Sequence, residues 1–427
     1  MNTILLFSAF SLLLLLRIPI AIALVASTTL MFWLSDSFSM WTIPQKMFTS
    51  LNQTTLIAIP GFVLAGTIIA KGGIAKYLIE ALRAWIGHVP GGLSVVTILA
   101  CSFFAAISGS SPATAAAIGS IMVPAMVEAG YSKRYAMGLV AASGTLGILI
   151  PPSIPLIVYG VVTEQSIGQL FMAGVIPGIG LTLLLVVYSI IYARMKGYGN
   201  LEKAGWKERW LSLKMAVWGG LLPILVLGCI YSGATTPTEA SIVSAVYGVI
   251  VSLVVYRERS IQKWVEILKE SIGITAMIML IIASAMVFSL YMTQEQIPQA
   301  LAEAMLSMDA LNKVMFFALT AILFFLLGMF LESSSIMLIT LPLLLPIMLS
   351  VDINPIHFAI VMIINMEIAQ ITPPVGLNLF VISGIAKSSL SEVFKGSIPF
   401  IVVMIAYMVF VMAWPAFTLW LPNQVMR

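Results

Sequence analysis

Charged residues are scarce in this chain. Asp, Glu, Lys and Arg make up 9% of its 427 residues, whereas 60% are hydrophobic and the mean hydropathy is +1.08. A soluble domain carries about 25% charged residues, so this composition excludes a soluble globular protein and predicts an integral membrane protein. The net charge of +4 says little about partners, because basic cytoplasmic loops alone would produce it.

Cysteine and histidine are also rare, with two residues of each. Cys101 and Cys229 both lie in apolar stretches, which favours buried, inert thiols over a disulfide or metal framework. His88 and His357 are too few and too far apart for a histidine-based metal centre. No GxxxxGK[ST] sequence occurs, which excludes ATP binding through a P-loop. If the protein moves a solute uphill, an ion gradient or another subunit must supply the energy.

Long apolar runs are abundant instead, and runs of about 17–25 residues between polar breaks predict transmembrane spans. The first run lacks the basic segment of a signal peptide and is about twice as long as a signal peptide's apolar core. We therefore expect a retained transmembrane helix there, kinked at Pro19. The predicted spans, about nine in all, are 4–33, 54–70, 134–160, 170–193, 216–233, 238–256, 272–292, 355–384 and 397–421.

Two further apolar regions, 93–127 and 313–349, are each interrupted near the middle by small and polar residues. Each region is long enough for two short helices but too short for two full crossings with a turn. We expect a re-entrant helical hairpin in each case, with a tip at membrane depth that protein or a water-filled cavity must surround. The interruptions are Gly109-Ser110-Ser111-Pro112 and Glu332-Ser333-Ser334-Ser335.

Lys and Arg are concentrated in two segments, 194–214 and 257–269. Because positive residues mark cytoplasmic loops, we expect both segments in the cytoplasm, the N-terminus in the cytoplasm and the C-terminus outside. Trp206, Trp210 and Trp264 lie within these basic segments. This combination predicts amphipathic helices lying at the membrane interface.

The two interrupted regions repeat each other at a shift of 222 residues. Basic residues flank the first hairpin, at Lys71, Lys76, Arg83, Lys133 and Arg134, whereas Glu295, Glu303, Asp352 and Asn354 flank the second. By the positive-inside rule the hairpins enter from opposite sides, so the repeats are inverted, as in secondary transporters. A channel could share parts of this design. The matched positions are Pro124 with Pro346, Pro151-Pro152 with Pro373-Pro374, Ser111 with Ser333, and Ser110 with Glu332.

A helix that is itself interrupted follows each hairpin, at 143–153 and at 365–374. The proline pair in each break ends one half-helix and starts another. Carbonyls and hydroxyls freed at such a break can hold a small cation, while half-helix N-termini present N–H groups to an anion. One arrangement therefore offers a cation site and a carboxylate site together.

The first break contains no ionisable residue, so neutral oxygen ligands favour Na⁺ over a proton there. The second copy has two intramembrane acids, Glu332 and Glu367, and either could balance Na⁺ or take up a proton. Three alternatives stay open: Glu332 as a water-facing residue at a helix N-terminus, Glu367 bonded to neighbouring backbone, and serines bonded to carbonyls one turn earlier.

The stretches SGSSPATAAAIGSIMVPAM at 108–126 and SGTLGILIPPSIPLIVYG at 143–160 resemble the large membrane subunit of tripartite ATP-independent periplasmic (TRAP) transporters. The stretch ITPPVGLNLFV at 371–381 resembles the second half of the same family. The resemblance covers essentially the whole chain. It implies an all-α polytopic fold of two inverted repeats, with a scaffold and a mobile transport domain that works by an elevator motion. It also implies a transporter of the bacterial inner membrane, not an enzyme, coupled to Na⁺ and without an organic cofactor.

The same resemblance implies two protein partners: a separate small four-helix membrane subunit and a periplasmic substrate-binding protein. No nucleic-acid partner is expected. Family substrates are mostly organic acids, and we expect sialic acid (N-acetylneuraminate). A C4-dicarboxylate or a sugar acid is the alternative substrate, and an ion or solute channel is the alternative class.

The resemblance also assigns site residues and domains. Na⁺ sites are expected at the hairpin tips and the facing breaks, on Ser108, Ser110, Ser111, Gly144 and Thr145, and on Gly328, Glu332, Ser333, Ser334 and Thr372. Substrate contacts are expected from Ser111, Ser153, Ser334 and Asn378. The expected domains are an N-terminal scaffold segment 1–53, repeat 1 at 54–193, a connector with scaffold helices at 194–271, and repeat 2 at 272–427.

Overall fold

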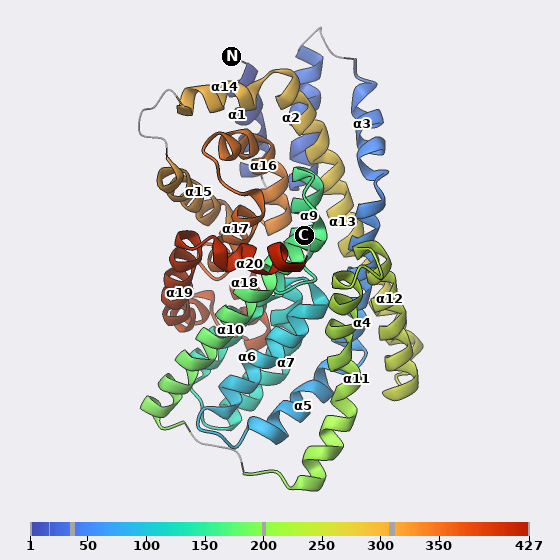
Figure 1. The fold of residues 1–427 in the computed structure, drawn as a ribbon, viewed down its shortest axis with the longest axis vertical. Coiled ribbons are helices and arrows are strands. Elements are labelled where there is room, and N and C mark those ends of the chain that lie inside the picture. The colour runs from blue at the N-terminus through green and yellow to red at the C-terminus, as the bar shows by residue number, and fades with distance from the viewer. Residues whose placement is uncertain (1, 17, 35–38, 199–201, 307–311, 426–427) are drawn as a thin grey trace.

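The computed structural model describes residues 2–16, 18–34, 39–198, 202–306 and 312–425, and in these ranges the chain is helical without a strand (Figure 1). The elements are α1 (Asn2–Leu15), α2 (Ile20–Leu34), α3 (Thr42–Leu51), η1 (Thr54–Ile57), α4 (Ala58–Lys71), α5 (Ile74–Ile86), α6 (Gly92–Ser108), α7 (Ser111–Glu128), α8 (Lys133–Thr145), η2 (Leu146–Ile148), α9 (Ile154–Thr163), α10 (Ile167–Lys196), α11 (Trp206–Tyr231), α12 (Pro237–Ile250), η3 (Val251–Val255), α13 (Ile261–Gln294), α14 (Ile297–Leu306), α15 (Lys313–Gly328), α16 (Ser333–Ser350), α17 (Pro355–Gln370), α18 (Leu377–Ala386), α19 (Leu390–Ala413) and α20 (Ala416–Val425).

Seven helices of the described chain are long and apolar enough to cross a membrane. Six of them coincide with predicted spans, and the seventh, α16, is the second arm of a predicted hairpin. The long helices also expose apolar side chains in stripes, such as Ile179, Leu183, Val187 and Ile191 along α10. A stripe of this kind fits a lipid-facing surface better than a water-facing one. The six matching helices are Thr54–Lys71, Ile167–Lys196, Trp206–Tyr231, Pro237–Val255, Ile261–Gln294 and Leu390–Ala413.

The predicted kinked helix over 4–33 is wrong, because α1 and α2 fold back on each other. Phe7 of α1 and Phe32 of α2 both contact α13, at Phe288 (6.0 Å between ring centroids) and Tyr291 (5.8 Å), which lie one helical turn apart. A continuous helix would separate Phe7 from Phe32 by about 37 Å. Pro19 ends the first helix more sharply than a kink, since it removes a donor and disfavours helical backbone at the residue before it.

The prediction of separate interfacial helices in the basic segments is also wrong. Residues from Trp206 onward form the first turns of α11, and residues from Ile261 onward form the first turns of α13. Neither stretch contains a proline or glycine before its apolar part begins, so nothing interrupts the helix. Trp206 and Trp210 are nevertheless exposed at the end of α11.

Arg209 joins α11 to the amphipathic helix α5. Its Nε donates to the Ala84 carbonyl at 3.1 Å, and its guanidinium lies over Trp85 and Trp206, 5.8 and 5.4 Å from their ring centroids. Trp85 Nε1 in turn donates to the Arg209 carbonyl at 3.1 Å. These contacts hold the last turn of α5 against the first turn of α11.

We expect Arg209→Ala to destabilise the protein by about 1–3 kcal/mol, the cost of a buried charged hydrogen bond and two cation–π contacts. The midpoint of thermal unfolding in detergent should fall accordingly. Lys207→Ala, two residues earlier in the same helix turn, is the matched control and should leave the midpoint unchanged. Equal midpoints for the two variants would contradict this role.

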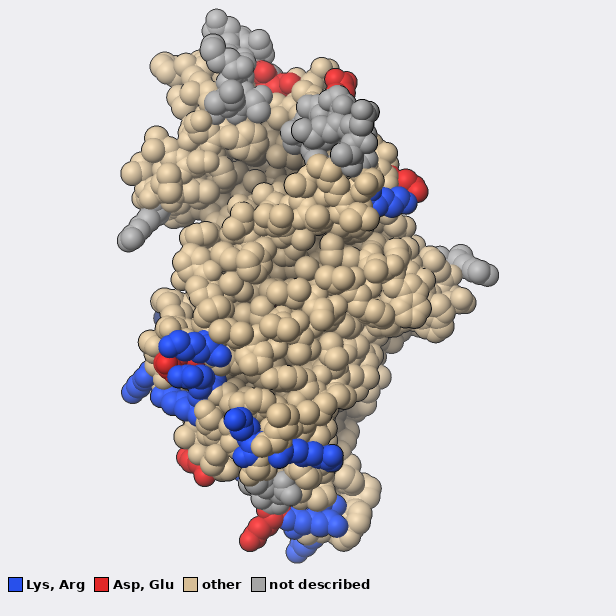
Figure 2. All heavy atoms as spheres, turned by 90° about the vertical axis from the view of Figure 1, so that its left-hand side faces the viewer, with Lys and Arg blue, Asp and Glu red and all other residues tan. Residues whose placement is uncertain are grey.

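The two hairpins enter the molecule from opposite ends. In Figure 1, α6 and α7 lie in the lower half and α15 and α16 in the upper half. We call the lower end, where α8 and α19 begin, the basic end; there Arg134 pairs with Glu392 at 2.9 Å, and Lys395 lies beside the same carboxylate. Figure 2 shows Lys and Arg gathered at this end of the visible face, above which a broad band carries neither charge. This distribution fits a membrane-embedded middle with a cytoplasmic basic end.

Candidate functional site

The tip of hairpin 1 brings three oxygen atoms together. The hydroxyls of Ser108 and Thr114 lie 2.9 Å apart, and both donate toward the carbonyl oxygen of Ser110, at 3.3 and 2.8 Å. Gly109 links the two arms in a left-handed conformation (φ +60°), which glycine adopts without strain. The tip therefore presents neutral oxygens only, the ligand type that suits a hard monovalent cation.

The break between α8 and α9 packs directly beneath this tip. A Cβ on Gly144 would lie 2.8 Å from the Ala115 side chain, and one on Gly147 would lie 2.6 Å from the Ser110 carbonyl oxygen. These two glycines therefore let the break approach the first turn of α7. The N–H of Ile154 then donates to the Gly109 carbonyl at 3.3 Å. Hairpin 1 is thus bonded to its own broken helix.

The tip of hairpin 2 is built around Glu332, which caps α16. Its carboxylate accepts hydrogen bonds from the Ser334 backbone N–H at 3.0 Å and from the Ser334 hydroxyl at 3.1 Å. Gln370 Nε2, at the end of α17, donates to the Ser333 hydroxyl at 2.7 Å. The position equivalent to Ser110 in the first copy therefore carries a carboxyl group, which the backbone N–H and the hydroxyl of Ser334 already engage.

The second break is bonded to its hairpin in the same way as the first. The N–H of Gly376, two residues after the proline pair, donates to the Met329 carbonyl at 3.0 Å, just as the N–H of Ile154, two residues after its own pair, donates to Gly109. Gly328 lets α15 approach α17, since a Cβ there would lie 2.5 Å from that of Ala369. The repeat predicted from the proline spacing is therefore a repeat of contacts as well.

Ser111 and Asn378 join the two halves. The Ser111 hydroxyl donates to Asn378 Oδ1 at 3.0 Å, and Asn378 Nδ2 donates to the Ala141 carbonyl at 3.1 Å. Both side chains are fully buried. The helices also exchange partners, because α7 of hairpin 1 packs on α18 and α16 of hairpin 2 packs on α9. The hairpins and broken helices therefore form one interlocked body.

Three of the expected site hydroxyls bond to nearby backbone. Thr145 donates to the Ala142 carbonyl at 2.7 Å and Thr372 to the Ile368 carbonyl at 2.8 Å. Ser153 bridges its break, donating to Ile148 at 2.6 Å and capping α9. Glu367 is fully buried in α17, and neither of its oxygens has a hydrogen-bond partner among the described residues.

Thr114 and Gln370 lie at the hairpin tips but are not among the site residues expected from the sequence. Thr114 lies one turn after Ser110, and Gln370 lies two residues before Thr372. Each faces the hairpin tip of its own repeat through a hydrogen bond to a serine. Helical spacing from the tip serines, at i+4, would have identified Thr114.

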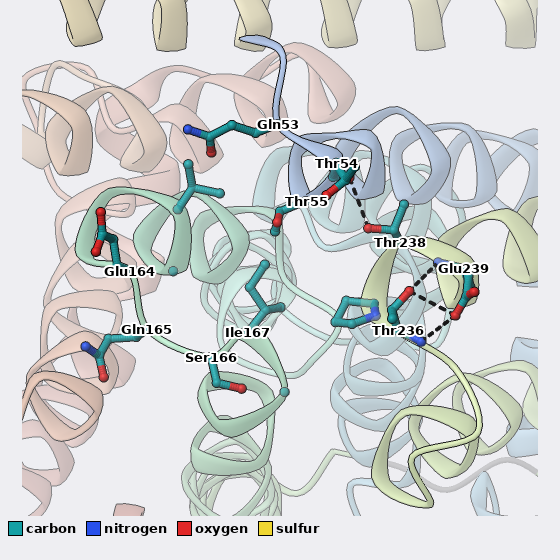
Figure 3. Close-up of a pocket in the computed structure, with 14 residues that line it drawn as sticks. Gln53, Thr54, Thr55, Glu164, Gln165, Ser166, Ile167, Thr236, Thr238 and Glu239 are labelled. Carbon is teal, nitrogen blue, oxygen red and sulfur yellow. Dashed lines mark hydrogen bonds between the residues drawn. The ribbon is translucent and has the colours of Figure 1, made fainter. Parts of the chain in front are cut away.

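A separate polar cleft of about 690 Å³ lies away from the hairpin tips (Figure 3). It is formed by the junction before α4, the α9–α10 loop and the turn before α12. Thr238 donates to the Thr54 carbonyl at 3.2 Å, and Thr236 and Glu239 form the capping box of α12. Glu164 lies across the cleft from these residues in Figure 3. None of the expected site residues lines this cleft.

Side chains of the kind that hold transition metals are not clustered among the described residues. Within the described ranges, no three His, Cys, Asp or Glu residues are grouped so that they could hold a metal ion. The converging groups are hydroxyls, carbonyls and one engaged carboxylate.

Comparison with known proteins finds relatives among membrane transporters. The chain is 45% identical to the C4-dicarboxylate TRAP transporter large permease protein DctM of Pseudomonas aeruginosa, over 88% of each chain. It is 36% identical to the sialic acid TRAP transporter large permease protein SiaM of Vibrio cholerae, over 95% of each. The YdaH transporter of Alcanivorax borkumensis shares the fold, with a TM-score of 0.65 over 88% of this chain and 87% of that one at 13% identity.

The model of the family described as the tripartite ATP-independent periplasmic transporter, DctM component, matches residues 7–417. This range includes both hairpins and both broken helices. The TRAP resemblance expected from the hairpin motifs is therefore confirmed, as are an all-helical membrane fold and a transport rather than an enzymatic function. The chain belongs to the family of TRAP transporter large permease subunits.

Proposed function

We propose that this chain is the transport subunit of a Na⁺-coupled importer of C4-dicarboxylates, working by an elevator motion. The observation that carries the proposal is the interlocked body: each hairpin is bonded to its own break, and Ser111 and Asn378 join the halves. Such a body can move as one unit. In this proposal α6–α10 and α15–α20 form the transport body, and α1–α5 with α11–α14 form the scaffold.

Na⁺ is proposed as the coupling ion because of the ligands at the two tips. Ser108, Ser110 and Thr114 offer neutral oxygens, and the second tip adds the Glu332 carboxylate. A hard monovalent cation suits both sets. Ser111, Ser333, Ser334, Gly144 and Gly328 hold these tips against the breaks in this proposal. Thr145, Thr372 and Ser153 contribute indirectly in this proposal, because their hydroxyls bond to the backbone carbonyls at the breaks and hold that backbone in place.

The substrate proposed is a C4-dicarboxylate rather than sialic acid. A relative named for C4-dicarboxylate is 45% identical to this chain, whereas a relative named for sialic acid is 36% identical. The alternative substrate of the sequence analysis therefore has better support than the main one. Oriented N–H groups and hydroxyls near Ser111 and Asn378 suit a carboxylate.

We also propose the membrane orientation and the partners. With the basic end in the cytoplasm of an inner-membrane protein, the fold-back of α1 on α2 puts the start of α1 level with the end of α2, on the periplasmic side. This replaces the expected cytoplasmic N-terminus, while the C-terminus, which follows α19 away from the basic end, stays periplasmic. A separate small membrane subunit and a periplasmic binding protein complete the transporter.

Reconstitution tests the proposal. The chain and its small subunit are placed in liposomes, and uptake of labelled succinate is measured with the binding protein outside. We expect uptake to require an inward Na⁺ gradient and to be competed by fumarate but not by N-acetylneuraminate. Undiminished uptake with K⁺ in place of Na⁺ would refute the coupling. Uptake without the binding protein would favour a channel.

A substitution of Glu332 distinguishes Na⁺ coupling from proton coupling at the second tip. Because two Ser334 donors stabilise its carboxylate, we expect Glu332→Gln to weaken the Na⁺ dependence of uptake by about tenfold, the loss of one charge-assisted ligand. Ser335→Ala, three residues later in the same helix turn, is the control, because the Ser335 hydroxyl has no hydrogen-bond partner among the described residues. A variant that changes the pH profile and keeps the Na⁺ dependence would instead assign a proton to this site.

A further inference from the structure

A small cavity connects the tip of hairpin 1 with an ion pair on the scaffold. The cavity has a volume of about 240 Å³ and lies between α4, α13 and the first turns of α7. Ser108 and Ser110 line it at the hairpin. Lys71 and Glu270 line it on the scaffold, where Lys71 Nζ lies 2.6 Å from a Glu270 carboxylate oxygen. Lys71 and Glu270 are the only charged residues in the described lining.

The lysine lies between the hairpin tip and the basic end. Hairpin 1 meets α4 at Gly66, where an added Cβ would lie 2.8 Å from the Ser108 Cα. Lys71 is five residues further along α4, about 7.5 Å toward the helix end. After Lys71 the chain turns into α5, which Arg209 binds at the basic end. A solute that left the tip through this cavity toward that end would pass Lys71.

The Lys71–Glu270 pair is exposed enough for its members to exchange partners. The Lys71 and Glu270 side chains keep 37% and 44% of their surface exposed, and exposed ion pairs are weak and easily screened. The rest of the cavity is lined largely by apolar and small residues such as Val63, Ala113 and Ile274. Lys71 is therefore the one cation in the described lining that can attract an incoming anion. Lysine, a mobile point charge, can turn from one carboxylate to another.

We propose that Lys71 is a substrate-binding residue, which receives a carboxylate of the dicarboxylate as it leaves hairpin 1, and that Glu270 competes with the substrate for the lysine. The proposal rests on the function and orientation proposed above. Glu270 then has a defined effect: by taking Lys71 back, it lowers the affinity on the cytoplasmic side and speeds release. The two members of one ion pair thus act on substrate affinity in opposite directions.

Two neutralising variants test this directly. Succinate binding to the purified protein is measured by titration calorimetry in Na⁺ for the wild type, Lys71→Gln and Glu270→Gln. We expect Lys71→Gln to raise the Kd about fivefold and Glu270→Gln to lower it by a similar factor, the worth of an exposed pair. In liposomes Glu270→Gln should also slow net uptake, because release is slower. Lys76→Gln, which removes an exposed ion pair with Glu80 on α5, is the control and should change neither quantity.

The outcomes separate the possible roles. If the pair only holds α4 to α13, both variants lose the same contact, so shifts of equal sign in Kd and melting temperature would overturn the proposal. An unchanged Kd in both variants would overturn it as well. If the wild type neither binds nor transports succinate, the proposed function fails first. If the wild type transports normally and Lys71→Gln binds as tightly as it does, this inference alone is wrong.

Discussion

Alanine at Gly138 or at Gly396 is expected to prevent the protein from folding. The two glycines form the crossing of α8 and α19, and a Cβ on Gly138 would lie 2.1 Å from the carbonyl carbon and oxygen of Gly396. A Cβ on Gly396 would lie 2.0 Å from the carbonyl oxygen of Arg134. Because these neighbours are backbone, no side chain can rotate away. The helices must separate, at a cost above the usual 1–3 kcal/mol of overpacking.

The measurement is the amount of monodisperse protein recovered in detergent and its melting temperature. Gly384→Ala, inside α18, is the matched control, since nothing lies within 4 Å of a Cβ there. We expect this control to be neutral or to stabilise by up to about 1 kcal/mol, the helix propensity of alanine over glycine. Full recovery and unchanged melting of Gly138→Ala would contradict the close crossing of α8 and α19.

Asn378→Leu is expected to reduce dicarboxylate uptake by about a hundredfold while leaving the fold in place. Leucine has a similar volume but removes the acceptor of Ser111 and the donor to Ala141, both fully buried contacts. Two buried polar groups then lose their partners, at about 1–3 kcal/mol each. A free-energy change of 1.4 kcal/mol is a factor of ten in an equilibrium constant. The arrangement in which the tip of hairpin 1 contacts α18 should therefore become a minor population.

A double-mutant cycle with Ser111→Ala tests the link itself. Because the two side chains share one hydrogen bond, the effects of Ser111→Ala and Asn378→Leu should not add. Ser120→Ala is the control on the same helix, since Ser120 is exposed and, among the described residues, its hydroxyl donates to the carbonyl of Ala117 in the preceding turn of α7. Additive losses in uptake would show that Ser111 and Asn378 act separately.

The sequence predicted the parts of the fold that local chemistry determines. Proline pairs and serine-rich interruptions mark the breaks and the tips, because proline removes donors and ends helices wherever it occurs. The opposite charges beside the two hairpins predicted that the repeats are inverted in the membrane. The fold-back at Pro19 was missed, since a kink and a sharp turn have the same sequence signature there. Only the contacts of Phe7 and Phe32 with α13 distinguish them.

The grouping of the candidate site residues was predictable within each repeat but not between repeats. Ser108, Ser110 and Ser111 are adjacent in sequence, so their grouping at one tip follows from the motif. Asn378 was expected near the substrate, but its bond to Ala141, 237 residues away, depends on how α18 packs on α7 and α8. The Lys71–Glu270 pair joins helices 199 residues apart for the same reason. Neither contact has a local signature.

Simultaneous measurement of ²²Na⁺ and labelled succinate entry into the same liposomes tests the central claim most directly. The transporter is reconstituted with its small subunit, and the binding protein is added outside. We predict that succinate entry brings Na⁺ with it in a fixed ratio, which persists when the Na⁺ gradient is varied. Succinate accumulation without any accompanying Na⁺ entry would contradict a Na⁺-coupled site at the hairpin tips.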